Sequence, residues 1–195
     1  MIVRWLDNIV KQMLVAAVMC GCLPTMVIAA HPLITDDTAT QGRTRYQLEM
    51  NSEYEYDRED ETTGKRLNFS SILSFGVTDT VDASLCVPAE HIETRNTDLD
   101  FMTHGITDIP LGIKLRFLET NSLSLALKPG ITLPAGNQEN GLGRGNINYE
   151  IFFIISRSVS HGRAVHLNLG YDRNENNLGE IQNLWHASFA SEGIL

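Results

Sequence analysis

The stretch RYQLEMNSEYEYD, residues 45–57, alternates apolar and polar side chains along almost its whole length. One face is polar throughout, and the other carries Tyr46, Leu48, Met50, Tyr54 and Tyr56. Alternation with a period of two predicts a β-strand, because successive side chains of a strand point to opposite faces. Strands of soluble proteins usually have about 5–6 residues, so a polar face this long is typical of a strand that lines a water-filled barrel.

The same alternation recurs seven times along the rest of the chain. The runs span residues 67–75, 81–87, 111–117, 123–132, 147–155, 165–172 and 185–189. The connections alternate between short turns and long polar segments, the long ones being 57–65, 90–100, 134–146 and 173–180. Outer-membrane barrels alternate in the same way between short periplasmic turns and long external loops.

These patterns predict an all-β fold, an antiparallel up-and-down transmembrane β-barrel with about eight strands visible. The eighth run begins only at Trp185, and the chain ends on Leu195 rather than on an aromatic residue. We therefore expect the barrel to be truncated at its C-terminus. The alternative is a soluble β-sandwich or lipocalin-like barrel, whose apolar faces would point inward. Periodicity alone does not decide which face is inside.

The N-terminus is typical of an exported protein. Basic residues precede the apolar run MLVAAVMCGCLPTMVIAA, which ends in small residues of the kind that a signal peptidase reads. We predict a signal peptide over 1–29, a periplasmic N-terminal lead-in over 30–42 and the barrel over 43–195. Removal of the leader would leave Cys86 as the only cysteine, which excludes an internal disulfide.

The expected location is the outer membrane of a Gram-negative-type bacterium. Membrane lipid and the barrel-assembly machinery are the expected macromolecular partners, together with a small-molecule solute. The net charge of −9 gives no sign of nucleic-acid binding.

Charged side chains on the polar faces are the candidate lumen residues. They are Glu49, Glu53, Lys114, Arg116, Lys128 and Glu150. If the turn between the fourth and fifth runs centres on Asn121, Lys114 lies opposite Lys128, and facing like charges are unfavourable unless carboxylates intervene. The set predicts either a constriction that selects solutes or a network of salt bridges that holds a narrow barrel together and passes nothing.

The last run offers an alternative function. His186 and Ser188 are two residues apart and project from the same face. They are the candidates for an outer-membrane serine hydrolase, in which the histidine activates the hydroxyl, although an ordinary polar barrel wall also explains them. His166 and His186 could face each other, but two imidazoles fall short of a metal site. We therefore predict no enzyme activity, no metal and no cofactor, and interpret GLGRG, 141–145, as a mobile loop tip.

Several sequence blocks carry a family resemblance. They are HPLITDDTATQG (31–42), LSLALKPGITLPAG (123–136), GLGRG (141–145), VHLNLGYDRN (165–174) and LWHAS (184–188). In this order they resemble the MetA-pathway of phenol degradation family. The resemblance implies an exported β-barrel of the outer membrane and a link to the breakdown of aromatic compounds, and it implies no catalytic residues. Members are longer than this chain, which agrees with a truncated C-terminus.

The first block supplies the family-motif residues His31, Pro32, Thr35, Asp36 and Asp37. We interpret it as the lead-in to the first strand, in which Thr35, Asp36 and Asp37 cap the backbone before Gly42 turns the chain into the wall. The barrel pattern suggests a porin-like channel or facilitator, and the family resemblance implies that it takes up small aromatic or hydrophobic solutes. A structural barrel with a plugged lumen remains a further alternative.

Overall fold

The computed structural model describes residues 35–59, 62–96, 100–160, 162–176 and 179–193. The predicted signal peptide, His31 and Pro32 lie outside these ranges. The strands are β1 (Tyr46–Glu59), β2 (Thr62–Gly76), β3 (Val81–Arg95), β4 (Asp100–Ile106), β5 (Ile109–Glu119), β6 (Leu123–Leu133), β7 (Asn148–Ser160), β8 (Arg163–Arg173) and β9 (Asn183–Gly193), and η1 (Gln138–Asn140) is a short 3-10 helix. No helix in the described part of the chain is long and apolar enough to cross a membrane.

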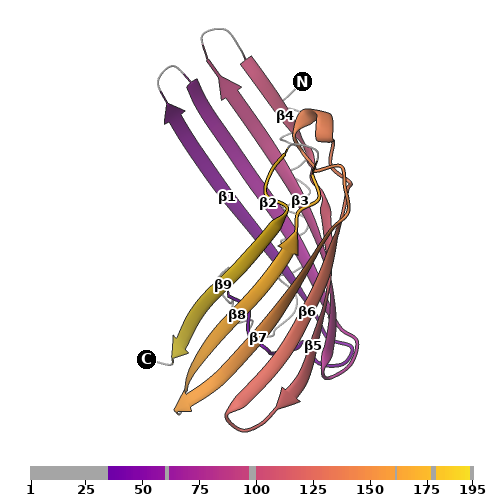
Figure 1. Cartoon of the computed structure of the whole chain (residues 1–195), viewed down its shortest axis with the longest axis vertical. Coiled ribbons are helices and arrows are strands. Elements are labelled where there is room, and N and C mark those ends of the chain that lie inside the picture. Colours follow the sequence, from indigo (N-terminus) through magenta and orange to yellow (C-terminus); the bar gives the residue numbers. More distant parts are fainter. Residues whose placement is uncertain (1–34, 60–61, 97–99, 161, 177–178, 194–195) are drawn as a thin grey trace, which may run out of the picture. The chain divides into compact units, whose positions relative to one another are not determined.

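All nine strands belong to one antiparallel sheet (Figure 1). Strands that follow each other in the sequence lie side by side, in the order β1-β2-β3-β5-β6-β7-β8-β9, and β4 pairs with β3. The sheet curves into a half-barrel whose edges are β1 and β9. The prediction of an all-β, antiparallel up-and-down fold is confirmed.

β4 and β5 are two halves of one strand. Both pair with β3, and the register moves by one residue between the two ladders. At the junction, Thr107 N still donates to the carbonyl of Pro88 at 3.1 Å. Such a β-bulge bends a strand without ending it. The eight runs of the sequence therefore correspond to eight strands, one of which is broken at Thr107 and Asp108.

Two of the expected long loops are mostly strand in their described residues. Residues 57–59 and 62–65 extend the β1–β2 ladder to the pair Glu59↔Thr62, and residues 90–95 extend the β3–β4 ladder to the pair Arg95↔Asp100. Apart from Ile92, these residues carry no large apolar side chain on either face, so the apolar alternation stops while the backbone pairing goes on. A ladder needs only backbone N–H and C=O groups, which is why the strands outlast the hydropathy pattern.

The last strand is also longer than the sequence suggests. β9 has 11 residues, as many as β8, and the two pair along their whole length. The run of 185–189 that the sequence shows is therefore shorter than the strand, because the flanking residues join the ladder without adding to the apolar pattern.

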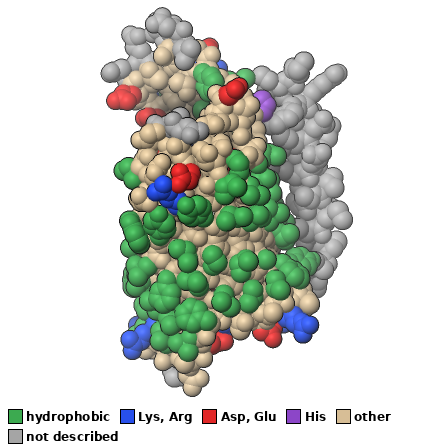
Figure 2. Space-filling view, turned by 45° about the vertical axis from the view of Figure 1, so that its right-hand side comes forward, with side chains coloured by type: hydrophobic (Ala, Val, Ile, Leu, Met, Phe, Trp, Pro, Cys, Tyr) green, Lys and Arg blue, Asp and Glu red, His purple; other side chains and the backbone are tan. Residues whose placement is uncertain are grey.

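The apolar side chains lie on the outer face of the curved sheet and are exposed. One example from each long strand is Leu48, Leu67, Val87, Leu115, Ile131, Ile151, Leu169 and Phe189. Figure 2 shows such side chains as a broad band over the strands, with most of the charged side chains toward its two ends.

The polar side chains point to the inner face and make up most of the buried residues. Among the described residues the buried hydrophobic ones are Ala126, Leu142 and Ile154, whereas nine polar or charged residues are buried. A soluble sandwich or lipocalin-like barrel has the opposite arrangement, because burial of apolar area drives its folding. The described sheet therefore has the polar interior that the barrel prediction requires.

Candidate lumen site

The N-terminal segment, residues 35–42, lies on the polar inner face of the sheet. It hydrogen-bonds to residues on β3, β5, β6 and β7, which are distant in the sequence. Thr35 and Thr38 are buried there. The lead-in therefore does more than precede β1, because it fills part of the space that the sheet encloses.

Asp36 is the centre of these contacts. Its Oδ1 accepts a hydrogen bond from Lys114 Nζ on β5 and its Oδ2 one from Lys128 Nζ on β6, each at 2.8 Å. The neighbouring pair Leu115↔Leu127 puts the two lysines opposite each other. One carboxylate thus bridges two facing ammonium groups and offsets their mutual repulsion.

The charge of Asp36 depends on the two lysines. Burial alone would raise the pKa of the Asp36 carboxyl, because the charged form loses hydration. The positive charges of Lys114 and Lys128, with the hydrogen bonds they donate, outweigh burial and hold that pKa below its ordinary value. The side chains keep 31% (Asp36), 14% (Lys114) and 33% (Lys128) of their surface exposed. The Asp36 carboxyl is therefore charged at neutral pH, and the three side chains are only partly shielded from water.

The backbone around Asp36 is also held by the wall. Lys114 Nζ donates to the carbonyls of Asp37 and Ala39 at 3.1 and 3.2 Å. With its amide oriented to satisfy both polar atoms, Asn168 on β8 accepts from Asp36 N at 2.6 Å and donates to the Asp36 carbonyl at 2.9 Å. The inner face thus binds the peptide groups of the segment as well as its charge.

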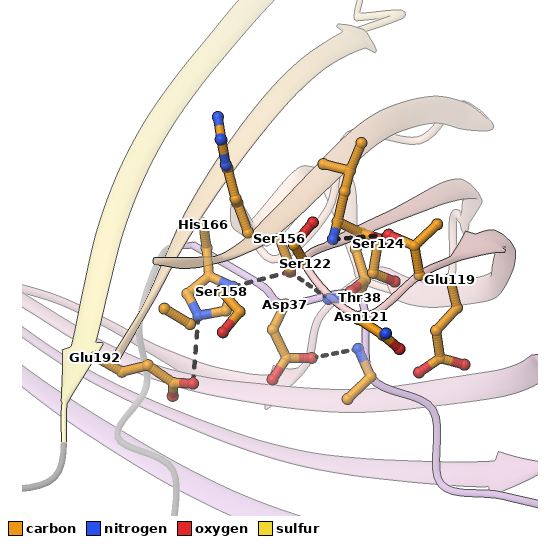
Figure 3. Close-up of a pocket in the computed structure, with 15 residues that line it drawn as sticks. Asp37, Thr38, Glu119, Asn121, Ser122, Ser124, Ser156, Ser158, His166 and Glu192 are labelled. Carbon is orange, nitrogen blue, oxygen red and sulfur yellow. Dashed lines mark hydrogen bonds and ion pairs between the residues drawn. The ribbon is translucent and has the colours of Figure 1, made fainter. Parts of the chain in front are cut away.

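A second anchor lies at Thr38 (Figure 3). Thr38 N donates to Ser156 Oγ at 3.0 Å, and Ser156 Oγ lies 2.9 Å from His166 Nδ1. His166 Nε2 lies 3.6 Å from Glu192 Oε1, at the end of β9. These groups border a hollow of about 250 Å³ that is lined by the segment, by the turn after β5 and by residues of β7, β8 and β9. The Ser156 hydroxyl therefore ties the segment to the wall.

The segment enters β1 through a tight turn. Gly42 has a φ of 80° and Thr44 a φ of 63°, both in the left-handed region. Arg45 N closes the turn by donating to the Gly42 carbonyl at 3.1 Å. A Cβ on the facing Gly76 would lie 1.9 Å from that carbonyl oxygen, so both glycines are needed for this close approach. Gly42 turns the chain into the wall, as predicted.

Two other aspartates, Asp37 and Asp82, accept hydrogen bonds from backbone N–H groups of the segment. Asp37 caps the local backbone as predicted, since its Oδ1 accepts from Ala39 N at 2.7 Å. Asp82 on β3 accepts from Gln41 N at 2.9 Å. Asp36 does not cap its neighbours, and the interpretation of it as a local cap is wrong because two lysines of the wall take both of its oxygens.

The structure brings together only part of the predicted lumen set. Lys114 and Lys128 meet at Asp36, and Glu150 and Glu49 are near enough to Lys128 to interact with it electrostatically. These residues form a mixed-charge cluster on the inner face.

The other two predicted lumen residues, Arg116 and Glu53, lie away from the cluster around Asp36. Arg116 donates to the carbonyl of Asp79 at 2.9 Å and pairs with Glu119 at 3.3 Å, near a short turn. Glu53 is exposed on β1, opposite Asn68 of β2. Neither contacts the cluster around Asp36 within the described residues.

The predicted His186 and Ser188 pair shares a face of β9. Within the described ranges no hydrogen bond joins the two, and the His186 ring lies 5.8 Å from the ring of Phe152. The His–Ser contact that the structure contains joins His166 to Ser156. The expectation that His166 faces His186 is wrong in the β8–β9 register. No three His, Cys, Asp or Glu side chains gather as a metal site in the same part of the chain.

The glycine-rich connection after β6 folds onto the inner face beside β4. Asp108, buried at the bulge, accepts from Gly136 N at 3.0 Å and from Arg144 N at 2.7 Å. Leu142 is buried and its side chain comes close to Gly105 of β4. The expectation of a free loop tip is therefore wrong, because the connection is held by a carboxylate and by an apolar contact.

Three residues of the site were not predicted in these roles, namely Asp36 as a bridge, and Asn168 and Ser156 as anchors. Their partners lie far away in the sequence, as in the 78-residue separation of Asp36 and Lys114. One signal was available: two facing lysines require an anion, and the acidic TDD of the lead-in could supply it.

The curved antiparallel meander, with its polar inner face, defines the class of protein as a β-barrel-type fold. The chain belongs to the family described as "Putative MetA-pathway of phenol degradation", whose model matches residues 29–193. The match confirms the resemblance and includes the N-terminal segment together with all the strands. No curated protein matches the sequence.

Proposed function

We propose that the protein is an outer-membrane β-barrel that gives small solutes a polar path across the membrane. The observation that carries the proposal is the burial pattern, in which apolar side chains are exposed and polar ones are buried. A monomeric soluble protein rarely exposes so extended an apolar surface. In a bilayer the same surface would contact lipid, and the polar face would line the lumen.

The strand lengths support this proposal. Apart from β4, the strands have 11 to 15 residues. A tilted strand needs about 9–11 residues to cross the hydrocarbon core. In this proposal residues 1–29 direct export, and the barrel-assembly machinery inserts the protein.

The family description and the charged residues on the inner face of the sheet indicate which solutes to test. The family description links the chain to phenol degradation, so phenol and other small aromatic compounds are the first solutes to test. They would diffuse along the inner face past Lys114, Lys128, Glu49 and Glu150, which lie close together there. The fixed charges would order water and exclude large apolar molecules.

The test uses the full-length protein purified from the outer membrane in detergent. We expect an electrophoretic band that shifts on heating, as a folded barrel gives, and discrete conductance steps in a planar bilayer. A protein that stays soluble and monodisperse without detergent would contradict the membrane assignment. A heat-shifting band with silent bilayers would leave the barrel in place and remove the passage.

A second candidate function is a structural barrel with an occupied lumen. The N-terminal segment on the inner face favours it, because the segment is held by contacts on several strands. Silent bilayers for both the wild type and Asp36→Asn would support this candidate over the channel. Neither function makes the protein an enzyme, and covalent labelling of Ser188 or Ser156 by a fluorophosphonate would contradict both.

A further inference from the structure

Lys114 and Lys128 already hold a carboxylate in this structure, and it comes from the chain itself. Each ammonium group donates to a different oxygen of Asp36 at 2.8 Å. The two lysines project from adjacent strands toward the same point of the inner face. Their geometry is therefore that of a small anion site, shown with its ligand in place.

We propose that Lys114 and Lys128 form a carboxylate-binding site on the inner face, occupied in this conformation by Asp36, and that a solute carrying a carboxylate competes with Asp36 for it. The inference rests on the proposed function, because a solute reaches the site only through the lumen. It names the class of solute as small organic carboxylates, for which benzoate is a simple aromatic probe.

The local charges set the strength of the site. Without Asp36, the two ammonium groups would face each other and attract an anion. Glu150 and Glu49 act on Lys128 as well, and their negative charges oppose a second anion. A free carboxylate must also displace a tethered one, whose effective concentration is of the order of millimolar. We therefore expect weak binding in the wild type and stronger binding once the Asp36 charge is removed.

Binding of a solute at this site would loosen the N-terminal segment. Lys114 holds the carbonyls of Asp37 and Ala39 in addition to the Asp36 carboxylate. A carboxylate that draws Lys114 away from Asp36 would weaken these bonds too, and would leave the segment held by anchors such as Asn168 at the Asp36 backbone, Ser156 at Thr38 and Asp82 at Gln41. By linkage, the factor by which carboxylate binding favours release of the segment equals the factor by which release of the segment strengthens carboxylate binding.

The experiment measures binding of benzoate and of phenol, which share a ring but differ in charge, to the full-length protein in detergent by titration calorimetry. Asp36→Asn keeps the size of the side chain and removes its charge. We expect it to bind benzoate at least about tenfold more tightly than the wild type, and to bind phenol no better. Glu55→Gln removes one charge from β1, away from the lysines, and should leave benzoate binding at the wild-type level.

The lysines complete the test. In the Asp36→Asn background, Lys114→Met and Lys128→Met should each lower benzoate affinity at least about tenfold, in protein whose heat-shifted band shows that it is folded. If Lys114→Met or Lys128→Met prevents folding, the glutamine substitution at the same position serves in its place. Equal benzoate affinity in the wild type, Asp36→Asn and the lysine variants would overturn the inference.

Failure of the proposed function would look different. Silent bilayers, combined with benzoate binding that follows the lysines, would remove the passage and keep the carboxylate site. Conducting bilayers, with benzoate binding that ignores the lysines, would keep the passage and remove the site.

Discussion

Asp36 uses its two carboxylate oxygens on two different strands, and the two lysines it joins are unequal. Lys114 makes three hydrogen bonds to the N-terminal segment and is the more buried, whereas Lys128 makes one and has further carboxylates nearby. Removal of one partner from a partly buried ion pair leaves the other charge uncompensated. We therefore expect Lys114 to contribute more than Lys128 to the stability of the folded protein.

We predict that Lys114→Met destabilises the folded protein by about 1–3 kcal/mol, and Lys128→Met by less. The free energy of unfolding in detergent, followed by the heat-shifted band in urea, measures the difference. In combination with Asp36→Asn, the cost of Lys114→Met should shrink by about 1 kcal/mol, because the pair no longer exists to be broken. Purely additive substitutions would contradict the bridge.

Acid should release the N-terminal segment. The pKa of Asp36 in the folded protein lies below its ordinary value, because Lys114 and Lys128 outweigh the effect of burial. A lowered pKa contributes stability that is fully present above the unfolded value of about 3.9 and is lost as the pH falls through the folded value. The bridge therefore holds at neutral pH and weakens only below about pH 4.

A spin label on Arg43→Cys, in a Cys86→Ser background, measures this release as increased mobility in acid. Asp36→Asn should be mobile at every pH and show no transition of its own. A label that loosens while the pH is still well above about 4 would contradict the assignment of the release to Asp36.

At the scale of elements, the connection after β6 depends on one carboxylate. Asp108 accepts two backbone N–H groups of this connection and is buried. We predict that Asp108→Ala frees the connection and raises the rate of trypsin cleavage after Arg144 by about tenfold or more, since hydrogen bonds to a charged group contribute about 1.5–3 kcal/mol each. Asp100→Ala, at an exposed position on β4, is the matched control and should not change the rate.

The elements differ in how far they could be predicted from the sequence. The middle of each strand was predictable, because alternation of residues such as Leu48 and Glu49 is local and survives in a single sequence. The ends at Glu59 and Arg95 were not, because polar residues on both faces join a ladder without leaving a pattern. The contacts of Asp36 could not be placed either, since they join residues 78 and 92 positions apart and depend on how the sheet curves.

For the whole molecule, a membrane barrel requires the apolar face of the sheet to point outward and the polar face inward. Alternation predicts two faces but not which is inside, and the N-terminal segment on the polar face resolves this in the structure. The unpaired β1 and β9 edges of the described sheet are long, and long open edges tend to pair with further strands. Soluble proteins rarely expose an apolar surface as extended as this band.

The most direct test of this claim uses Trp185, which is 80% exposed on the outer face of β9 and packs beside Tyr171. Trp5 is the other tryptophan of the chain, so in a Trp5→Phe variant the tryptophan fluorescence comes from Trp185 alone. In vesicles, we predict strong quenching by lipids brominated on their acyl chains and little quenching by aqueous iodide. Strong iodide quenching without bromine quenching would contradict an outward, lipid-facing apolar surface and with it the membrane barrel.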